Sequence, residues 1–172
     1  IEGNPFAERQ EFSDDAVYPG FMDLIRSTRP AQCTLVPDDP AQLTSDHGWD
    51  LNRDLKRLQP IMAELRNLGI RTSLFMDPDP EQILLAGKLG TNRIELYTGP
   101  YADAFGTSEQ DKIYQQFYQA AVVARDEGLG LNAGHDLNLD NLSLFCQVPQ
   151  LMEVSIGHAI VCDALWMGLG KT

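Results

Sequence analysis

The stretch LRNLGIRTSLF, residues 65–75, runs from the end of a helical pattern through a glycine into a β-rich segment, and this order decides the fold. The same order recurs in LAGKLGTNRIEL, residues 85–96, and in ARDEGLGLNAG, residues 124–134. Strands that alternate with helices pair in parallel through right-handed crossovers. The repetition therefore predicts an α/β fold, and a (β/α)₈ TIM barrel in particular.

The same reading extends to the rest of the chain. Short β-rich runs predict five complete strands, at 32–36, 71–75, 93–97, 130–133 and 152–156. Apolar residues at helical spacing predict helices at 49–68, 79–89, 108–127 and 139–146, and a last helix that begins after Gly157. Pro60 should kink or divide the first of these helices, and Thr107 or Ser108 should cap the third. Residues 4–20 are polar and predict a long loop.

A doubly wound sheet of the flavodoxin or Rossmann type is the main structural alternative. Such a sheet has a single switch point instead of an iterated unit, and no strand here is followed by G-x-G-x-x-G. The chain begins Ile1-Glu2-Gly3, which resembles the end of a strand, and it stops soon after its last helix begins. We therefore expect one barrel domain over residues 1–172, from the end of strand 3 through strand 8, with the first two βα units absent.

Composition limits the classes of function. The formal net charge of −12 opposes nucleic-acid binding, which needs clustered Lys and Arg, although backbone N–H groups at a helix N-terminus can still hold a small phosphate. No apolar run reaches the roughly 18 residues that a membrane span needs, and no signal peptide is visible. Cys33, Cys146 and Cys162 are odd in number and widely spaced, which indicates a reducing compartment and neither disulfide nor zinc site. A soluble, cytoplasmic protein is predicted.

Polar residues at the C-terminal ends of barrel strands converge on one site. The residues in such positions are Glu2, Thr44, Ser45, Glu95, Tyr97, Thr98, Asn132, His135, Gly157 and His158. Residues 37–49, which contain Thr44, are long and polar and suit an active-site lid, with a mobile loop of no such role as the alternative. His47, in the same segment, is expected to be solvated.

Three of these positions carry the chemical argument. Glu95 lies between Ile94 and Leu96, so its carboxylate must face the barrel interior or be paired, the alternative being a structural ion pair with Arg93 or a nearby lysine. His135 follows a strand and a glycine, and imidazole suits general acid–base work near neutrality. Gly157 opens the last helix directly after a strand, where barrels often bind phosphate.

Several segments together resemble one family. They are TLVPDDPAQLTSDHGWDL (34–51), GIRTSLFMDPDPEQI (69–83), RIELYTGPYADAF (93–105), LNAGHDLNLDNL (131–142) and VSIGHAIVCDALWMGL (154–169). In this order and spacing they resemble the pyridoxine 5′-phosphate synthase family. The resemblance implies an eight-stranded barrel that condenses 3-amino-2-oxopropyl phosphate with 1-deoxy-D-xylulose 5-phosphate. It also implies that the enzyme needs no metal or other cofactor and assembles as a homo-octamer.

The resemblance also assigns roles. Glu2 aligns with a general base, Glu95 with a residue that stabilises charged intermediates, and His135 with the general acid. The substrate contacts that it implies are Thr44 for the deoxyxylulose phosphate, Asp136 through its backbone, and Gly157 and His158 for the phosphate of the amino ketone. The family's first two strands carry an Asn-x-Asp-His segment, a catalytic histidine and phosphate-binding arginines that this chain does not contain.

Two other functions stay open on the sequence. One is a different phosphate-binding TIM barrel that catalyses an isomerase or lyase reaction, and the other is a truncated, non-catalytic chain. Product analysis with both substrates separates the first alternative from the synthase, and an intact-mass measurement addresses the second.

Overall fold

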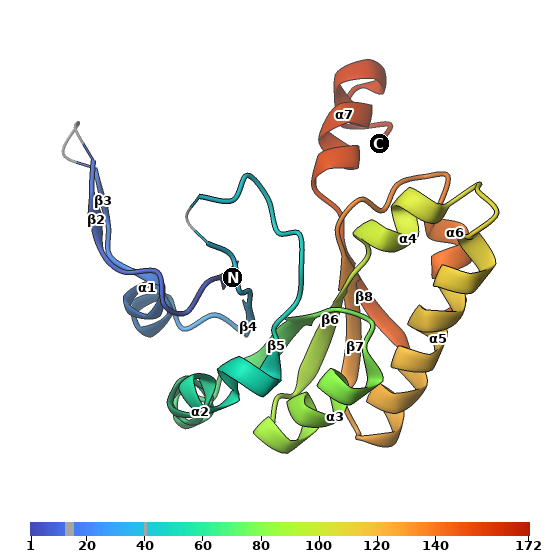
Figure 1. The fold of residues 1–172 in the computed structure, drawn as a ribbon. Helices are drawn as coiled ribbons and strands as arrows, with labels where there is room; N and C mark the ends of the chain where they lie inside the picture. The colour runs from blue at the N-terminus through green and yellow to red at the C-terminus, as the bar shows by residue number, and fades with distance from the viewer. Residues whose placement is uncertain (13–15, 40) are drawn as a thin grey trace.

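The computed structural model describes residues 1–12, 16–39 and 41–172, and within these ranges six strands form one parallel sheet. In spatial order the strands are β1 (Glu2–Gly3), β4 (Gln32–Leu35), β5 (Arg71–Met76), β6 (Arg93–Tyr97), β7 (Gly130–Gly134) and β8 (Leu151–Ser155). The sheet curls into a half-barrel (Figure 1). The predicted α/β class and the predicted parallel strands are confirmed, and the half-barrel is consistent with part of a TIM barrel.

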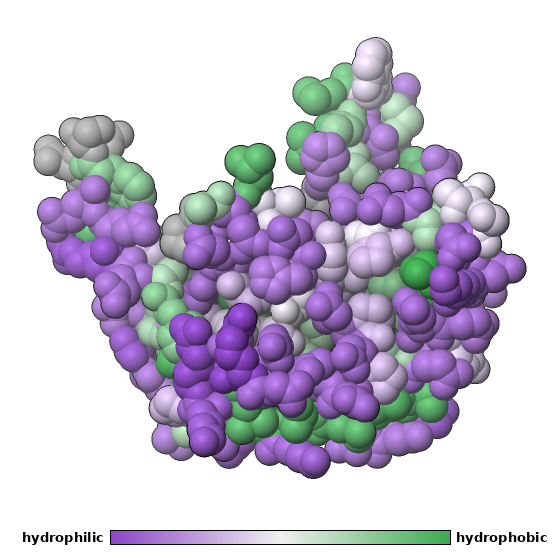
Figure 2. Space-filling model, viewed as in Figure 1, coloured by the Kyte–Doolittle hydropathy of each residue, from purple (hydrophilic) through white to green (hydrophobic). Residues whose placement is uncertain are grey.

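The described part of the chain contains seven helices, the last of which follows β8. They are α1 (Phe21–Thr28), α2 (Leu51–Asn67), α3 (Pro80–Leu89), α4 (Gly99–Ala104), α5 (Gln110–Asp126), α6 (Leu142–Phe145) and α7 (His158–Met167). Helices α2 and α3 pack on β5, and α5 packs on β7. Helix α7 extends away from the sheet and carries exposed apolar side chains, drawn green in Figure 2. No helix of the described ranges is long and apolar enough to cross a membrane.

Alternation along each strand separates the hydrophobic core from the inner face of the half-barrel. On β6, Ile94 and Leu96 are fully buried and belong to the core that the helices cover. Arg93, Glu95 and Tyr97 lie on the opposite face, because successive strand residues point to opposite sides of a sheet. The inner face is therefore where polar side chains can meet.

Helix α2 shows that a proline need not divide a helix. The Asp50 side chain caps it by accepting a hydrogen bond from the Asn52 N–H at 3.1 Å, and the helix continues through Pro60 to Asn67. Of the two outcomes predicted at Pro60, a kink or a division, the division was wrong. Pro60 and Lys56, whose carbonyl loses its intrahelical partner, are both exposed, so water can satisfy that carbonyl.

Two other helices are shorter than predicted. Helix α5 begins at Gln110 and its N-cap position makes no side-chain hydrogen bond, so the predicted cap was wrong; the Thr107 hydroxyl instead accepts from the Glu109 N–H at 3.2 Å. The helix predicted at 139–146 is reduced to α6. The Asn138 side chain accepts from the Asn141 N–H at 3.2 Å and holds the preceding residues in a turn.

Residues 4–20 are more ordered than the predicted loop. Strands β2 (Gln10–Glu11) and β3 (Val17–Tyr18) pair in antiparallel fashion, and α1 begins directly after Gly20. Residues 13–15 lie outside the described residues. The loop prediction was therefore wrong for these two strands, whose two-residue length gives no readable alternation.

Candidate functional site

A cavity of about 730 Å³ opens at the C-terminal ends of the strands. All seven predicted site residues line it, namely Glu2, Thr44, Glu95, His135, Asp136, Gly157 and His158. These residues come from both halves of the chain and meet because the carboxyl ends of parallel strands share one edge of the sheet. Sequence reasoning did not single out the other lining residues, Leu137, Ser155, Ile156 and Ala159.

Glu95 is the buried carboxyl group of this cavity. Its residue is only 2% exposed, and its Oε2 accepts a hydrogen bond from the Thr34 hydroxyl at 3.3 Å. Burial raises the pKa of Glu95 above its ordinary value, while hydrogen bonds from Ser155 and Thr34 and the charge of His135 act in the opposite direction. A buried carboxyl group with a perturbed pKa in a cavity is typical of a working site.

The alternative ion pair between Glu95 and Arg93 does not form in the structure. Although these two residues share a face of β6, Arg93 Nη1 lies 2.8 Å from Glu153 Oε1 and donates to Asn132 Oδ1 at 2.9 Å. The guanidinium is therefore neutralised deeper in the half-barrel, and Glu95 is left for the cavity.

Gly134 gives the Glu95 carboxylate its space. A Cβ atom at Gly134 would lie 2.5 Å from Glu95 Oε1, far inside van der Waals contact. Glu95 pairs with Asn132 across β6 and β7, and Gly134 lies two residues further along the same face. Gly134, on β7, thus leaves room for the carboxylate of Glu95 on the neighbouring strand β6.

His135 and Asp136 follow β7 with left-handed backbone conformations, at φ 83° and 55°. Such conformations cost non-glycine residues on the order of 1–3 kcal/mol and persist only where the surroundings enforce them. Here the Thr98 hydroxyl donates to the carbonyls of both Gly134, at 2.7 Å, and His135, while Asn141 Nδ2 donates to the Asp136 carbonyl at 3.0 Å. The turn is therefore held from both sides.

The His135 ring is fixed by aromatic neighbours. It packs edge-on against Tyr97, with ring centroids 5.5 Å apart, and against Phe75 at 5.9 Å. Its Nδ1 lies 4.0 Å from Asp136 Oδ2. The imidazole is thus aimed at the cavity with a carboxylate beside it, an arrangement suited to proton transfer.

Glu2 brings a second carboxyl group to the cavity from β1. The residue as a whole is exposed at the outer edge of the sheet, whereas its carboxyl group lines the cavity and is partly desolvated by neighbouring protein atoms. This burial, followed by the negative charges of Glu95 and Asp38, raises the pKa of Glu2 to about 7. A carboxyl with this pKa exchanges a proton readily at neutral pH.

The opposite wall of the cavity can accept an anion. Gly157 is the N-cap of α7, and the helix starts with the hydrogen bond from Val161 N–H to the Gly157 carbonyl at 3.1 Å. Free N–H groups at a helix N-terminus favour phosphate. His158 adds an imidazole at the same point, its Nε2 lying 3.4 Å from Cys162 Sγ.

Thr44 lines the cavity from the segment 37–49, of which Pro40 lies outside the described residues. His47 is half exposed, as predicted for a solvated histidine, and contacts Asp46 at 2.5 Å. In the described ranges no group of three or more His, Cys, Asp or Glu side chains is placed to hold a metal ion.

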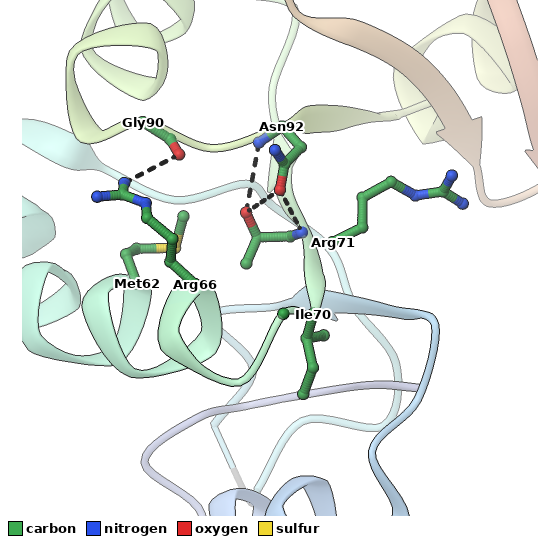
Figure 3. A pocket seen from close by; sticks show the side chains of 8 residues that line it. Met62, Arg66, Ile70, Arg71, Gly90 and Asn92 are labelled. Carbon is green, nitrogen blue, oxygen red and sulfur yellow. Dashed lines mark hydrogen bonds between the residues drawn. The ribbon is translucent and has the colours of Figure 1, made fainter.

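A second cavity, of about 400 Å³, lies at the opposite ends of β5 and β6 (Figure 3). Its polar groups are used within the protein: Asn92 Oδ1 accepts from the Thr72 N–H at 2.8 Å, and Arg66 Nη2 donates weakly to the Gly90 carbonyl at 3.4 Å. The side chains of Arg66 and Arg71 point away from each other, so they do not converge on one ligand.

Comparison with known proteins places these observations in a family. The family described as pyridoxal phosphate biosynthesis protein PdxJ matches residues 13–172. Proteins named pyridoxine 5′-phosphate synthase from Xanthomonas campestris, Xanthomonas oryzae and Xylella fastidiosa are 51%, 48% and 47% identical over the whole of this chain. The chain covers 66%, 66% and 65% of their respective lengths. A family match over nearly the whole chain, with the site residues gathered in one cavity, shows that the chain belongs to the PdxJ family.

Proposed function

We propose that this chain is the larger part of a pyridoxine 5′-phosphate synthase. In the proposed reaction, 3-amino-2-oxopropyl phosphate and 1-deoxy-D-xylulose 5-phosphate condense to pyridoxine 5′-phosphate, inorganic phosphate and water. The observation that carries the proposal is the single cavity that joins two carboxyl groups, an imidazole and a helix N-terminus. The relatives' shared name supports the same reaction.

The groups divide into proton-transfer and phosphate-binding roles. Glu2, with a pKa of about 7, acts as the base, and His135 acts as the acid that assists loss of water during ring closure. Glu95 stabilises the cationic intermediates that follow Schiff-base formation, because a buried carboxylate acts strongly on nearby positive charge. Two carboxyl groups and an imidazole match the repeated proton transfers that condensation, elimination and aromatisation require.

The substrate contacts come from the rest of the lining. Gly157 and His158 bind the phosphate of the amino ketone, and Thr44 contacts the deoxyxylulose phosphate. Asp136 contributes its backbone, which is consistent with its left-handed φ of 55°. We further propose that residues 1–172 form one barrel domain, closed by two preceding βα units, in a cytoplasmic homo-octamer.

The test is product formation by the full-length protein supplied with both substrates. Mass spectrometry should detect pyridoxine 5′-phosphate together with free phosphate in equal amounts. Absence of the product from a folded, phosphate-binding protein would refute the synthase and leave an isomerase or lyase reaction, or no catalysis.

Two substitutions test the site itself. Glu95→Gln and His135→Ala should each lower turnover by about 10²–10⁴-fold and leave the protein folded. Because the raised pKa of Glu95 makes its ionised form costly in the folded state, Glu95→Gln should increase stability at pH values above that pKa. Glu11→Gln and His47→Ala, at exposed positions outside the cavity lining, are the matched controls. Unchanged turnover in both site variants would refute the assignment.

A further inference from the structure

Asp38 joins the two segments that carry Glu2 and Thr44. It lies three residues after β4, where its Oδ2 accepts a hydrogen bond from the Ser45 hydroxyl at 2.6 Å. Its main-chain carbonyl accepts from Asn4 Nδ2, also at 2.6 Å. Ser45 directly follows Thr44 and is only 7% exposed, and Asn4 is two residues beyond Glu2.

The second oxygen of Asp38 is not explained by these contacts. Asp38 Oδ1 is fully buried and has no hydrogen-bond partner among the described residues. Burying an unpaired polar atom is unfavourable, and the amide oxygen of an asparagine would also accept the Ser45 hydrogen bond, although more weakly than a carboxylate does. The hydrogen bond to Ser45 therefore does not by itself explain why a charged side chain occupies position 38.

We propose that Asp38 is a positioning residue of the active site, which holds Thr44 against the substrate through Ser45 and sets the electrostatic environment of Glu2. The inference rests on the proposed function. Asp38 does not line the cavity, so it acts through these neighbours and does not touch the substrate.

The groups around Glu2 support the electrostatic part of this role. Negative charges on Glu95 and Asp38 favour the protonated form of Glu2. Glu95 is also a predicted catalytic group, so Asp38 is the carboxylate whose charge can be removed without removing a reacting group. Its loss should make Glu2 a weaker base that ionises at lower pH.

The mechanical part of the role is tested by a double-mutant cycle in the full-length protein. Ser45→Ala and Asp38→Ala should each raise KM for 1-deoxy-D-xylulose 5-phosphate on the order of tenfold, with smaller effects on kcat. The double variant should be no worse than the worse single variant, because both changes break the same connection. Asp126→Asn and Ser27→Ala, both at exposed positions, are the matched controls.

The electrostatic part is tested by Asp38→Asn, which keeps an acceptor for Ser45. This variant should keep KM within about threefold of the wild type. Its profile of kcat/KM against pH should show the acid limb at lower pH than in the wild type. A role confined to folding would instead lower the thermal midpoint and leave KM and the pH profile unchanged.

Additive effects of Asp38→Ala and Ser45→Ala, or an acid limb of Asp38→Asn that coincides with the wild type, would overturn the proposal. Circular dichroism of every variant establishes that it is folded before kinetics are compared. A wild-type protein that forms no pyridoxine 5′-phosphate refutes the synthase itself. An active wild type beside variants with unchanged constants refutes only the role of Asp38.

Discussion

Substitution of Gly134 by alanine should displace the Glu95 carboxylate, while the main chain at residue 134 keeps its conformation. The new Cβ would lie 2.5 Å from Glu95 Oε1, and an ordinary contact begins near 3.4 Å, so the carboxylate must move by about 0.9 Å. The next neighbour, Ser155 Cβ, would lie at 3.2 Å and needs only a small adjustment. Gly134 is not among the glycines with positive φ, so alanine is allowed there.

Two magnitudes follow from this displacement. Overpacking of a filled site costs about 1–3 kcal/mol of folding free energy, which urea unfolding of the purified variant would measure. A misplacement of about 1 Å at a reacting group can lower turnover about 100-fold, which the rate of pyridoxine 5′-phosphate formation would measure. Gly170→Ala, at a position where a Cβ meets nothing within 4 Å, is the control.

The same substitution in a protein that lacks the Glu95 carboxylate tests whether Gly134→Ala acts through Glu95. In a Glu95→Ala protein, Gly134→Ala has no carboxylate to displace, so it should cost little stability and no further turnover. Turnover of Gly134→Ala within about twofold of the wild type would refute the reasoning, as would equal losses in both backgrounds.

Three further predictions concern neighbouring groups. Because the base must be ionised and the pKa of Glu2 is about 7, kcat/KM should fall as pH drops below about 7, and Glu2→Gln should remove this limb together with most turnover. Thr34→Val removes a hydrogen bond to the Glu95 carboxylate, so NMR titration should show the pKa of Glu95 rising further; a fall would contradict the assignment. Tyr101→Phe removes the 2.7 Å hydrogen bond to the Asn141 carbonyl. Urea unfolding should therefore show a free energy of unfolding about 1 kcal/mol lower than that of the wild type. An unchanged free energy would show that water replaces the lost bond.

The strands were predictable because their signal is local. A glycine that ends a helix, followed by a short β-rich run, occurs before both β5 and β6, and both strands lie where this pattern places them. Positions at strand ends then brought Glu95 and His135 to one cavity. Parallel topology makes this inference possible, since each strand contributes its end residues to the same face.

The features that the sequence patterns missed depend on particular side-chain contacts, some local and some between distant segments. The shortening of the helix at 139–146 follows from the Asn138 side chain, which binds backbone N–H groups and competes with the helix. The buried position of Asp38 depends on Ser45 and Asn4, which belong to two loops. The space that Gly134 leaves for Glu95 depends on the register between two strands, which no local pattern reveals.

The alternation of inner-face and core residues assigns the polar site groups and the apolar core of this sheet to different positions. On β6 and β7, Glu95 and Asn132 face inward, while the intervening Ile94, Leu96 and Ala133 fill the core. A combinatorial library that varies only inward positions would therefore leave the helix-covered core unchanged, and it would have to avoid overpacked positions such as Gly134. The same separation offers a route by which gene duplication could yield enzymes with new substrates, since selection can act on one face of a strand while the other face keeps the protein folded.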